Sequence, residues 1–75
     1  MSAFPEPTVL WRLQRGSALA HATVFASRAE ATIAWFIDGV MDRVENYDTL
    51  GLALARADEI RGVLERDGWV DATES

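Results

Sequence analysis

Small residues occupy every second position in one stretch of the chain: Ala18, Ala20, Ala22, Val24 and Ala26. A spacing of two places these side chains on one face of a β-strand. Alanine is a poor strand former, so its repetition indicates that another element packs closely over this face. The run therefore predicts a strand over residues 18–26 whose small side chains form the floor of a hydrophobic core.

Three further segments alternate apolar and polar residues and are joined by turn signals. Gly16-Ser17 and Asp38-Gly39 are two-residue pairs of the kind that accept positive φ in tight hairpins, and residues 27–30 form a short polar loop. Tight turns between consecutive strands predict an antiparallel meander. The three additional strands are expected at residues 8–15, 31–37 and 40–47.

The turns also predict the register, because the loop length decides which residues face each other. With this register, all three hairpins place their most apolar residues on one shared face, where Trp11 and Trp35 stand on either side of Ala22. The expected pairs are Leu13–Ala20, Trp11–Ala22, Val9–Val24, Ala26–Ala31, Val24–Ile33, Ala22–Trp35, Ile37–Val40, Trp35–Asp42 and Ile33–Val44.

A C-terminal helix is expected to cover this apolar face. Asp48 or Thr49 can cap its start, and Gly68 can end it while Trp69 folds back on Leu64. The predicted fold is α+β: a four-stranded antiparallel β-meander with one C-terminal α-helix on one face. We expect a flexible arm at residues 1–7, a single domain over 8–70 and a disordered tail at 71–75. The apolar stripe of the helix is Leu50, Ala53, Leu54, Ala57, Ile60 and Leu64.

The composition excludes several kinds of catalytic and metal chemistry. The chain has no cysteine and no lysine, which rules out thiol nucleophiles, thiolate metal sites and Schiff-base catalysis. Its one histidine, His21, is expected opposite Arg12 and beside Phe36, a poor setting for a general base. The alternation points Asp42 toward the core, which we interpret as an edge-strand charge that discourages pairing. We expect no enzyme activity, no cofactor and no metal ion.

Charge and hydropathy limit the partners. The formal net charge is −5, and the acidic residues dominate the C-terminal half, which argues against broad binding of phosphate backbones. No stretch approaches the ~20 apolar residues of a membrane span. The first seven residues show no secretion signal. We therefore expect a cytoplasmic protein with no membrane partner.

The sheet face turned away from the helix is the expected functional surface. It combines aromatic, methionine and arginine side chains, a composition typical of protein interfaces. We expect a small non-catalytic module for protein–protein interaction or self-association. It would form a homodimer through this open face or an edge strand, or bind another protein. The candidate residues are Leu10, Arg12, His21, Thr23, Phe25, Phe36, Met41, Arg43 and Tyr47.

Two other hypotheses remain open. Aromatic and arginine side chains can stack and hold single-stranded nucleic acid, although the net negative charge disfavours this. A small-ligand pocket between helix and sheet, near Trp11 and Trp35, is the third hypothesis. The nucleic-acid hypothesis would use Arg12, His21, Phe36 and Arg43.

Overall fold

The computed structural model describes residues 7–27 and 30–72. Within them the chain forms an α+β fold with an antiparallel sheet and one helix, as predicted. The four predicted strands have the expected bounds. The elements are β1 (Thr8–Arg15), β2 (Ala18–Ala26), β3 (Ala31–Ile37), β4 (Val40–Tyr47), α1 (Leu50–Arg66) and β5 (Val70–Asp71).

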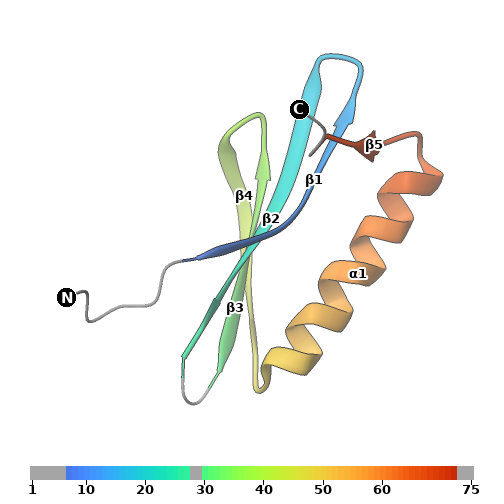
Figure 1. The fold of residues 1–75 in the computed structure, drawn as a ribbon. Coiled ribbons are helices and arrows are strands. Elements are labelled where there is room, and N and C mark those ends of the chain that lie inside the picture. Colours follow the sequence, from blue (N-terminus) through green and yellow to red (C-terminus); the bar gives the residue numbers. More distant parts are fainter. Residues whose placement is uncertain (1–6, 28–29, 73–75) are drawn as a thin grey trace.

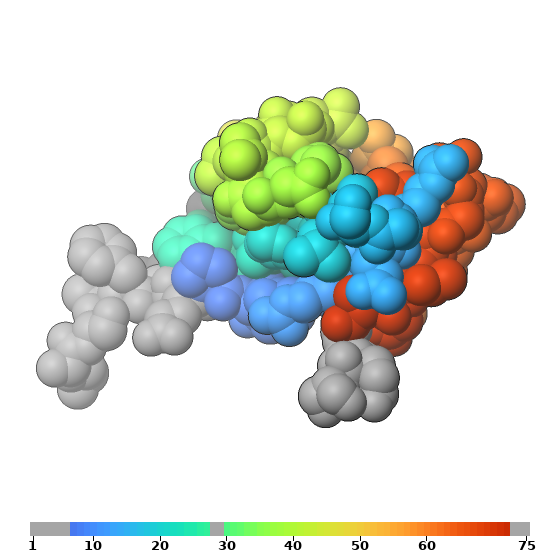
Figure 2. Space-filling view, turned by 90° about the horizontal axis from the view of Figure 1, so that it is seen from above, coloured from blue at the N-terminus to red at the C-terminus, as the bar shows by residue number. Residues whose placement is uncertain are grey.

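The sheet has the strand order β4-β3-β2-β1-β5, and each paired neighbour is antiparallel. Helix α1 runs along one face, from the end of β4 to the start of β5 beside β1 (Figure 1). Seen from the hairpin ends, β4 and the red C-terminal segment lie on opposite sides of β2 (Figure 2). In the part of the chain that is described, no element covers the other face of the sheet, hereafter the open face.

Strand β5 was not predicted. Val70 pairs with Gln14 and Asp71 with Leu13, and the amide of Ala72 donates to the carbonyl of Arg12 at 2.9 Å. Asp71 therefore belongs to the sheet, whereas the sequence assigned it to the tail. The other residues of the predicted tail, 73–75, and residues 1–6 of the predicted arm lie outside the described residues.

The β3–β4 turn has the conformation that its sequence predicts. Asp38 (φ 51°) and Gly39 (φ 82°) both adopt the left-handed region, as a type I′ hairpin requires. The turn is also bonded to β2: the amide of Asp38 donates to the carbonyl of Leu19 at 2.8 Å, and the Leu19 amide donates to Asp38 Oδ1 at 2.9 Å. These bonds extend the contact between β2 and β3 by one residue pair beyond Ala20–Ile37.

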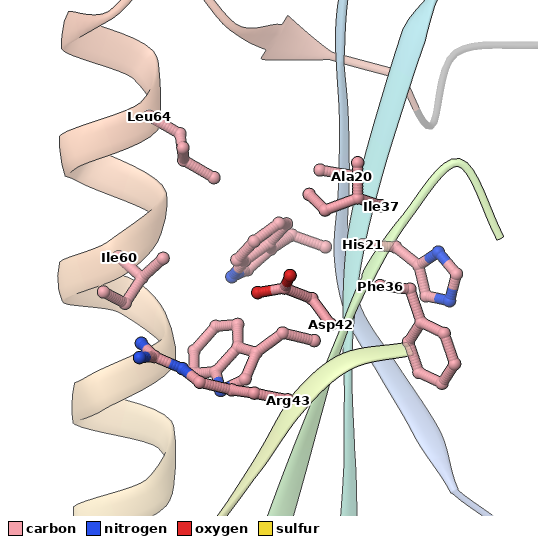
Figure 3. A pocket seen from close by; sticks show the side chains of 10 residues that line it. Ala20, His21, Phe36, Ile37, Asp42, Arg43, Ile60 and Leu64 are labelled. Atoms are coloured by element: carbon pink, nitrogen blue, oxygen red, sulfur yellow. The ribbon is translucent and has the colours of Figure 1, made fainter. Parts of the chain in front are cut away.

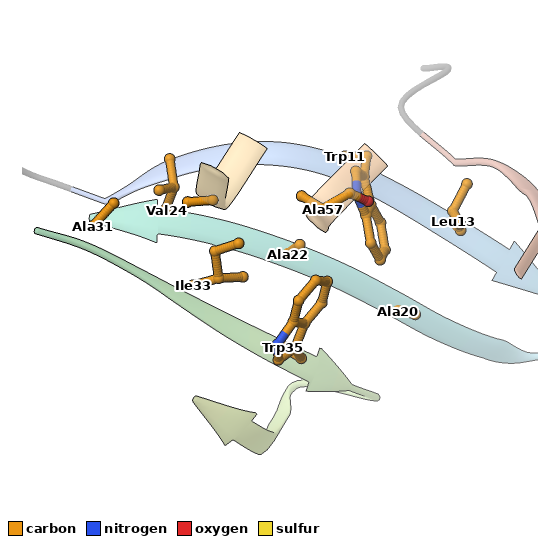
Figure 4. Packing of buried hydrophobic residues seen from close by; sticks show 10 residues of the cluster. Trp11, Leu13, Ala20, Ala22, Val24, Ala31, Ile33, Trp35 and Ala57 are labelled. Atoms are coloured by element: carbon orange, nitrogen blue, oxygen red, sulfur yellow. The ribbon is translucent and has the colours of Figure 1, made fainter. Parts of the chain in front are cut away.

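The core is built over the alanine strand, as expected. Trp11 and Trp35 rise from β1 and β3 on either side of Ala22, with ring centroids 6.0 Å apart (Figure 4). Helix α1 meets this floor with its own small residues, the buried Ala53 and Ala57. Trp11 Nε1 donates to the carbonyl of Ala57 at 3.0 Å. Small side chains on both elements therefore let the helix backbone come within reach of an indole N–H.

The predicted helix stripe is only partly buried. Ile60 and Leu64 are half-buried and pack against the core, but Leu50 and Leu54 are exposed, contrary to expectation. The buried contact between α1 and the sheet is centred on Ala53 and Ala57, so Leu50 and Leu54 lie at the edge of the interface.

Both ends of the helix follow the sequence signals. Thr49 is the N-cap, and its Oγ1 accepts from the Leu52 amide at 3.1 Å. Gly68 (φ 101°) reverses the chain, and the Trp69 amide donates to the carbonyl of Leu64 at 3.0 Å. Trp69 packs against the core. The hydrogen bond from the residue after a left-handed glycine back to the last helical turn is typical of a Schellman-type end.

A β-bulge interrupts the first hairpin. Leu13–Ala20 and Trp11–Ala22 pair as predicted, but Val9 faces Thr23 rather than Val24. Leu10 is the extra residue, so it and Trp11 together oppose one residue of β2. The middle hairpin, β2–β3, has its predicted register throughout.

A second bulge interrupts the third hairpin. Ile37 faces Val40 as predicted, but Trp35 faces Arg43 rather than Asp42, and Ile33 faces Glu45 rather than Val44. Asp42 is the extra residue. Since strand side chains alternate between faces, one extra residue moves every later residue of β4 to the face opposite the predicted one.

Candidate functional site

One predicted row of the open face is present as expected. The register aligns Arg12, His21, Phe36 and Met41 across β1, β2, β3 and β4. The rings of His21 and Phe36 are stacked, with centroids 4.4 Å apart and planes 8° apart. The stacked rings of His21 and Phe36 occupy the centre of the row and are half-buried, whereas Arg12 and Met41 at its two ends are exposed.

His21 is held toward its neutral form. Partial burial lowers the pKa of its imidazole below the usual 6.5, and the positive charge of Arg12 opposite lowers it further. A neutral ring stacked on a phenyl ring contributes apolar surface rather than charge to the open face. No carboxylate faces His21 in this row, so the orienting partner of a catalytic base is missing from it.

The second row differs from the prediction because of the two bulges. It contains Val9, Thr23, Ala34 and Val44. The predicted members Leu10 and Arg43 are absent from it. Leu10 packs against the core instead, and Arg43 faces Trp35 on the helix side of the sheet.

Tyr47 also lies on the helix side, opposite Ala31, and packs against the core. Its hydroxyl donates to Glu45 Oε1. This bond and the nearby arginines lower the pKa of Glu45, while burial and the same bond raise the pKa of Tyr47. Glu45 also pairs with Arg43 (3.4 Å) and with Arg56 of α1 (3.6 Å). Arg43 and Tyr47 thus belong to a polar cluster that joins β4 to the helix.

The corrected open face is more apolar than predicted. Among the described strand residues that the register assigns to it, Arg12 is the one that carries a formal charge. Five of its apolar members are exposed, and the predicted Thr23 and Phe25 are half-buried. Four exposed members were not predicted: Val9, Leu19, Val44 and Val70. The bulges bring Val9 and Val44 to this face, β5 brings Val70, and Leu19 lies there in the predicted register of β2. The described members of the open face are Val9, Arg12, Gln14, Leu19, His21, Thr23, Phe25, Thr32, Ala34, Phe36, Met41, Val44, Asn46 and Val70.

A pocket lies between the β3–β4 turn and the C-terminal segment, with a volume of about 260 Å³. Its lining comes from both faces of the sheet: Leu13 and Ala20 belong to the buried face, and Arg12, Leu19 and His21 to the open face. Gly39 and Ala72 complete the lining.

The described residues carry no group of three or more histidine, cysteine or acidic side chains that could hold a metal ion. No helix in residues 7–27 and 30–72 is both long and apolar enough to cross a membrane. In comparisons with protein-family models, with curated proteins and with solved structures, nothing matched this chain. Function must therefore be inferred from the surfaces themselves.

Proposed function

We propose that this protein is a non-catalytic self-association module that forms a homodimer through its open sheet face. The observation that carries the proposal is the effect of the β4 bulge. It moves Arg43 off the open face and puts Val44 there, which leaves one formal charge among the face's described strand residues. Depletion of charge at the centre of a surface is what distinguishes protein interfaces from ordinary surface.

A second copy is the occupant that the charge distribution favours. The chain carries a net charge of −5. The ion pairs of Arg15, Arg43, Arg56 and Arg61 lie on the helix side and the helix surface, away from the open face. Two copies that meet through their open faces keep these charges in solvent. Both copies also offer the same apolar residues, as a twofold interface requires.

The face is favoured over the sheet edges as the contact. Strand β4 is one edge, and its bulge and the charges of Asp42, Arg43 and Glu45 interrupt a regular ladder. Bulges and charges are the usual devices that prevent edge-to-edge pairing. At the other edge, β5 spans two residues, Val70–Asp71. The rest of that edge is the N-terminal half of β1, which the bulge at Leu10 interrupts. Neither edge therefore offers a long regular row of free backbone groups.

The size of the face sets the expected strength. Four strands ~4.8 Å apart and about seven residues long outline roughly 450 Å² of flat area, to which the protruding side chains add. A standard stable interface buries about 800 Å² per partner, so the open face lies at or below that size. We therefore expect a dissociation constant of roughly 1–100 µM, which is typical of a modest interface rather than of an obligate dimer.

The positions of two arginines weaken the nucleic-acid hypothesis. It required Arg12 and Arg43 on one surface, but Arg12 lies on the open face and Arg43 lies on the helix side. A single arginine beside aromatic rings provides little of the clustered positive charge on which phosphate binding depends. Binding of a short oligonucleotide that weakens with salt remains the result that would favour it.

The test compares two substitutions of the same kind on opposite surfaces. Val44 on the open face and Val63 on the helix are exposed to 45% and 48%. Sedimentation over a range from about 5 µM to about 500 µM should show reversible dimer formation for the unmodified chain. Val44→Asp should weaken the dimer at least about tenfold, because it buries a carboxylate in the contact, and Val63→Asp should leave it unchanged. Circular dichroism checks that both variants remain folded.

A chain that stays monomeric at the highest concentration would overturn the proposal. So would a dimer that Val63→Asp disrupts and Val44→Asp does not, since the contact would then lie on the helix. Replacement of Phe36 by Asp gives an independent check from the neighbouring row.

A further inference from the structure

The opposite side of the sheet contains a second pocket, between α1 and the β3–β4 hairpin. Its volume is about 160 Å³. Apolar walls come from Trp11, Trp35, Ile60 and Leu64, and the charged groups at its border are Asp42 and Arg43. The pocket exists because α1 packs closely on the sheet at Ala53 and Ala57, while farther along the helix Ile60 and Leu64 are only half-buried.

The bulge in β4 supplies the carboxylate. Asp42 is the extra residue, and it shares the space opposite Trp35 with Arg43. Figure 3 shows the Asp42 carboxylate extending toward the helix, on the side of Ile60 and Leu64, whereas the His21 and Phe36 rings point the other way. The carboxylate of Asp42, an exposed residue, takes part in no hydrogen bond or ion pair within the described residues. It lies at a pocket that two indole rings line.

The two charged residues that line the pocket, Asp42 and Arg43, differ in their pairing. Arg43 pairs with Glu45 at 3.4 Å, so its positive charge has a partner. The Asp42 carboxylate has no such partner within the described residues. A ligand with one positive charge would supply one. Indole faces attract such a cation through their negative π-face.

We propose that this pocket binds a compact organic cation, a primary or methylated ammonium attached to a small apolar body. The ammonium would lie against the Asp42 carboxylate. The apolar body would lie between the two tryptophan side chains of the sheet and the Ile60 and Leu64 side chains of α1. A cavity of about 150 Å³ is large enough for a benzene-sized group. The site lies on the helix side of the sheet, so it is independent of the self-association proposed for the open face.

The test uses three ligands of the same shape and different charge: benzylamine, benzyl alcohol and benzoate. The indole N–H signals of Trp11 and Trp35 in proton–nitrogen correlation spectra report binding, and Trp69, which does not line the pocket, is the internal reference. We expect benzylamine to shift the Trp11 and Trp35 signals saturably, with a dissociation constant of about 1 mM or lower for a ligand of this size. Benzyl alcohol should bind at least about fivefold more weakly.

Two variants separate the role of Asp42 from general charge. Asp42→Asn should weaken benzylamine binding about fivefold or more, to the level of benzyl alcohol. Asp58→Asn removes the same charge from an exposed helix position that does not line the pocket, and should leave the affinity unchanged. The same spectra show whether each variant is folded. Absence of saturable shifts, equal affinity for benzylamine and benzoate, or equal loss in both variants would overturn the proposal.

Discussion

The fit between Ala22 and its neighbours can be tested by enlarging this one side chain. Ala22 is fully buried, faces Trp11 on one neighbouring strand and Trp35 on the other, and lies beneath the contact with α1 (Figure 4). Ala22→Leu adds three carbon atoms at a position without free space above it. The helix or the indole rings must move to admit them.

The magnitude follows from the contacts that would be disturbed. Overpacking a filled core costs about 1–3 kcal/mol. Displacement of α1 would also lengthen the bond from Trp11 Nε1 to the Ala57 carbonyl, 3.0 Å in the native fold, and a lost hydrogen bond contributes about 1 kcal/mol. We expect a total loss of about 2–4 kcal/mol from an unfolding free energy of roughly 4–11 kcal/mol for a chain of this length. The melting temperature should fall by about 10–25 °C.

Urea and thermal unfolding followed by circular dichroism measure this change. The protein concentration must be the same for every variant, because dimer formation would itself stabilise the fold. Ala55→Leu is the matched control: it makes the same change at an exposed helix position and should alter stability by less than about 0.5 kcal/mol. If Ala22→Leu were as stable as the control, the helix would not pack closely on the alanine strand, and the explanation of the core would be wrong.

Three further predictions concern the cap, the turn and the histidine. Thr49→Ala removes the acceptor of the Leu52 amide and should lower the unfolding free energy by about 0.5–2 kcal/mol in urea titrations; an unchanged midpoint would contradict the capping role. Gly39→Ala places a Cβ at φ 82° and should cost about 1–2 kcal/mol by strain alone, because no atom lies within 4 Å of that Cβ. The pKa of His21 is lowered in the folded state, so its contribution is complete above the unfolded value of about 6.5 and is lost as the pH falls through the folded pKa. Unfolding between about pH 7.5 and pH 5.5 should therefore show a loss of stability that His21→Asn abolishes.

Most of the fold was predictable from residues that act locally. Glycine at positions 16, 39 and 68, with Asp38, marks two hairpin turns and the end of the helix, and all four adopt positive φ. Once the turns are placed, alternation determines the register as far as each strand remains regular. The β2–β3 hairpin is regular, and every predicted pair in it is present.

The bulges limited the prediction of the candidate site. A bulge adds one residue without changing composition, so counting outward from a turn assigns every later side chain to the wrong face. Near Leu10 the sequence offered no warning, because Val9, Leu10 and Trp11 are all apolar. In β4 a signal existed: Asp42 was a charged residue at a position predicted to face the core. It indicated an irregular strand rather than a regular strand with a misplaced charge.

Strand β5 was missed for a different reason. A strand of two residues, Val70–Asp71, is too short to show alternation, and it forms because the helix end delivers it to the free edge of β1. Its position depends on the length and direction of α1 relative to the sheet. The position of β5 is therefore set by the tertiary packing of the helix and cannot be predicted from a local sequence pattern.

We propose that two copies meet through the open face as the β4 bulge defines it. Isotope-filtered nuclear Overhauser spectra on a mixture of labelled and unlabelled chains test it directly. Contacts should join the methyl groups of Met41 and Val44 in one copy to the Phe25 and Phe36 rings of the other. Contacts confined to Leu52 and Val63 of the helix, or none at concentrations of about 1 mM, well above the expected dissociation constant, would contradict it.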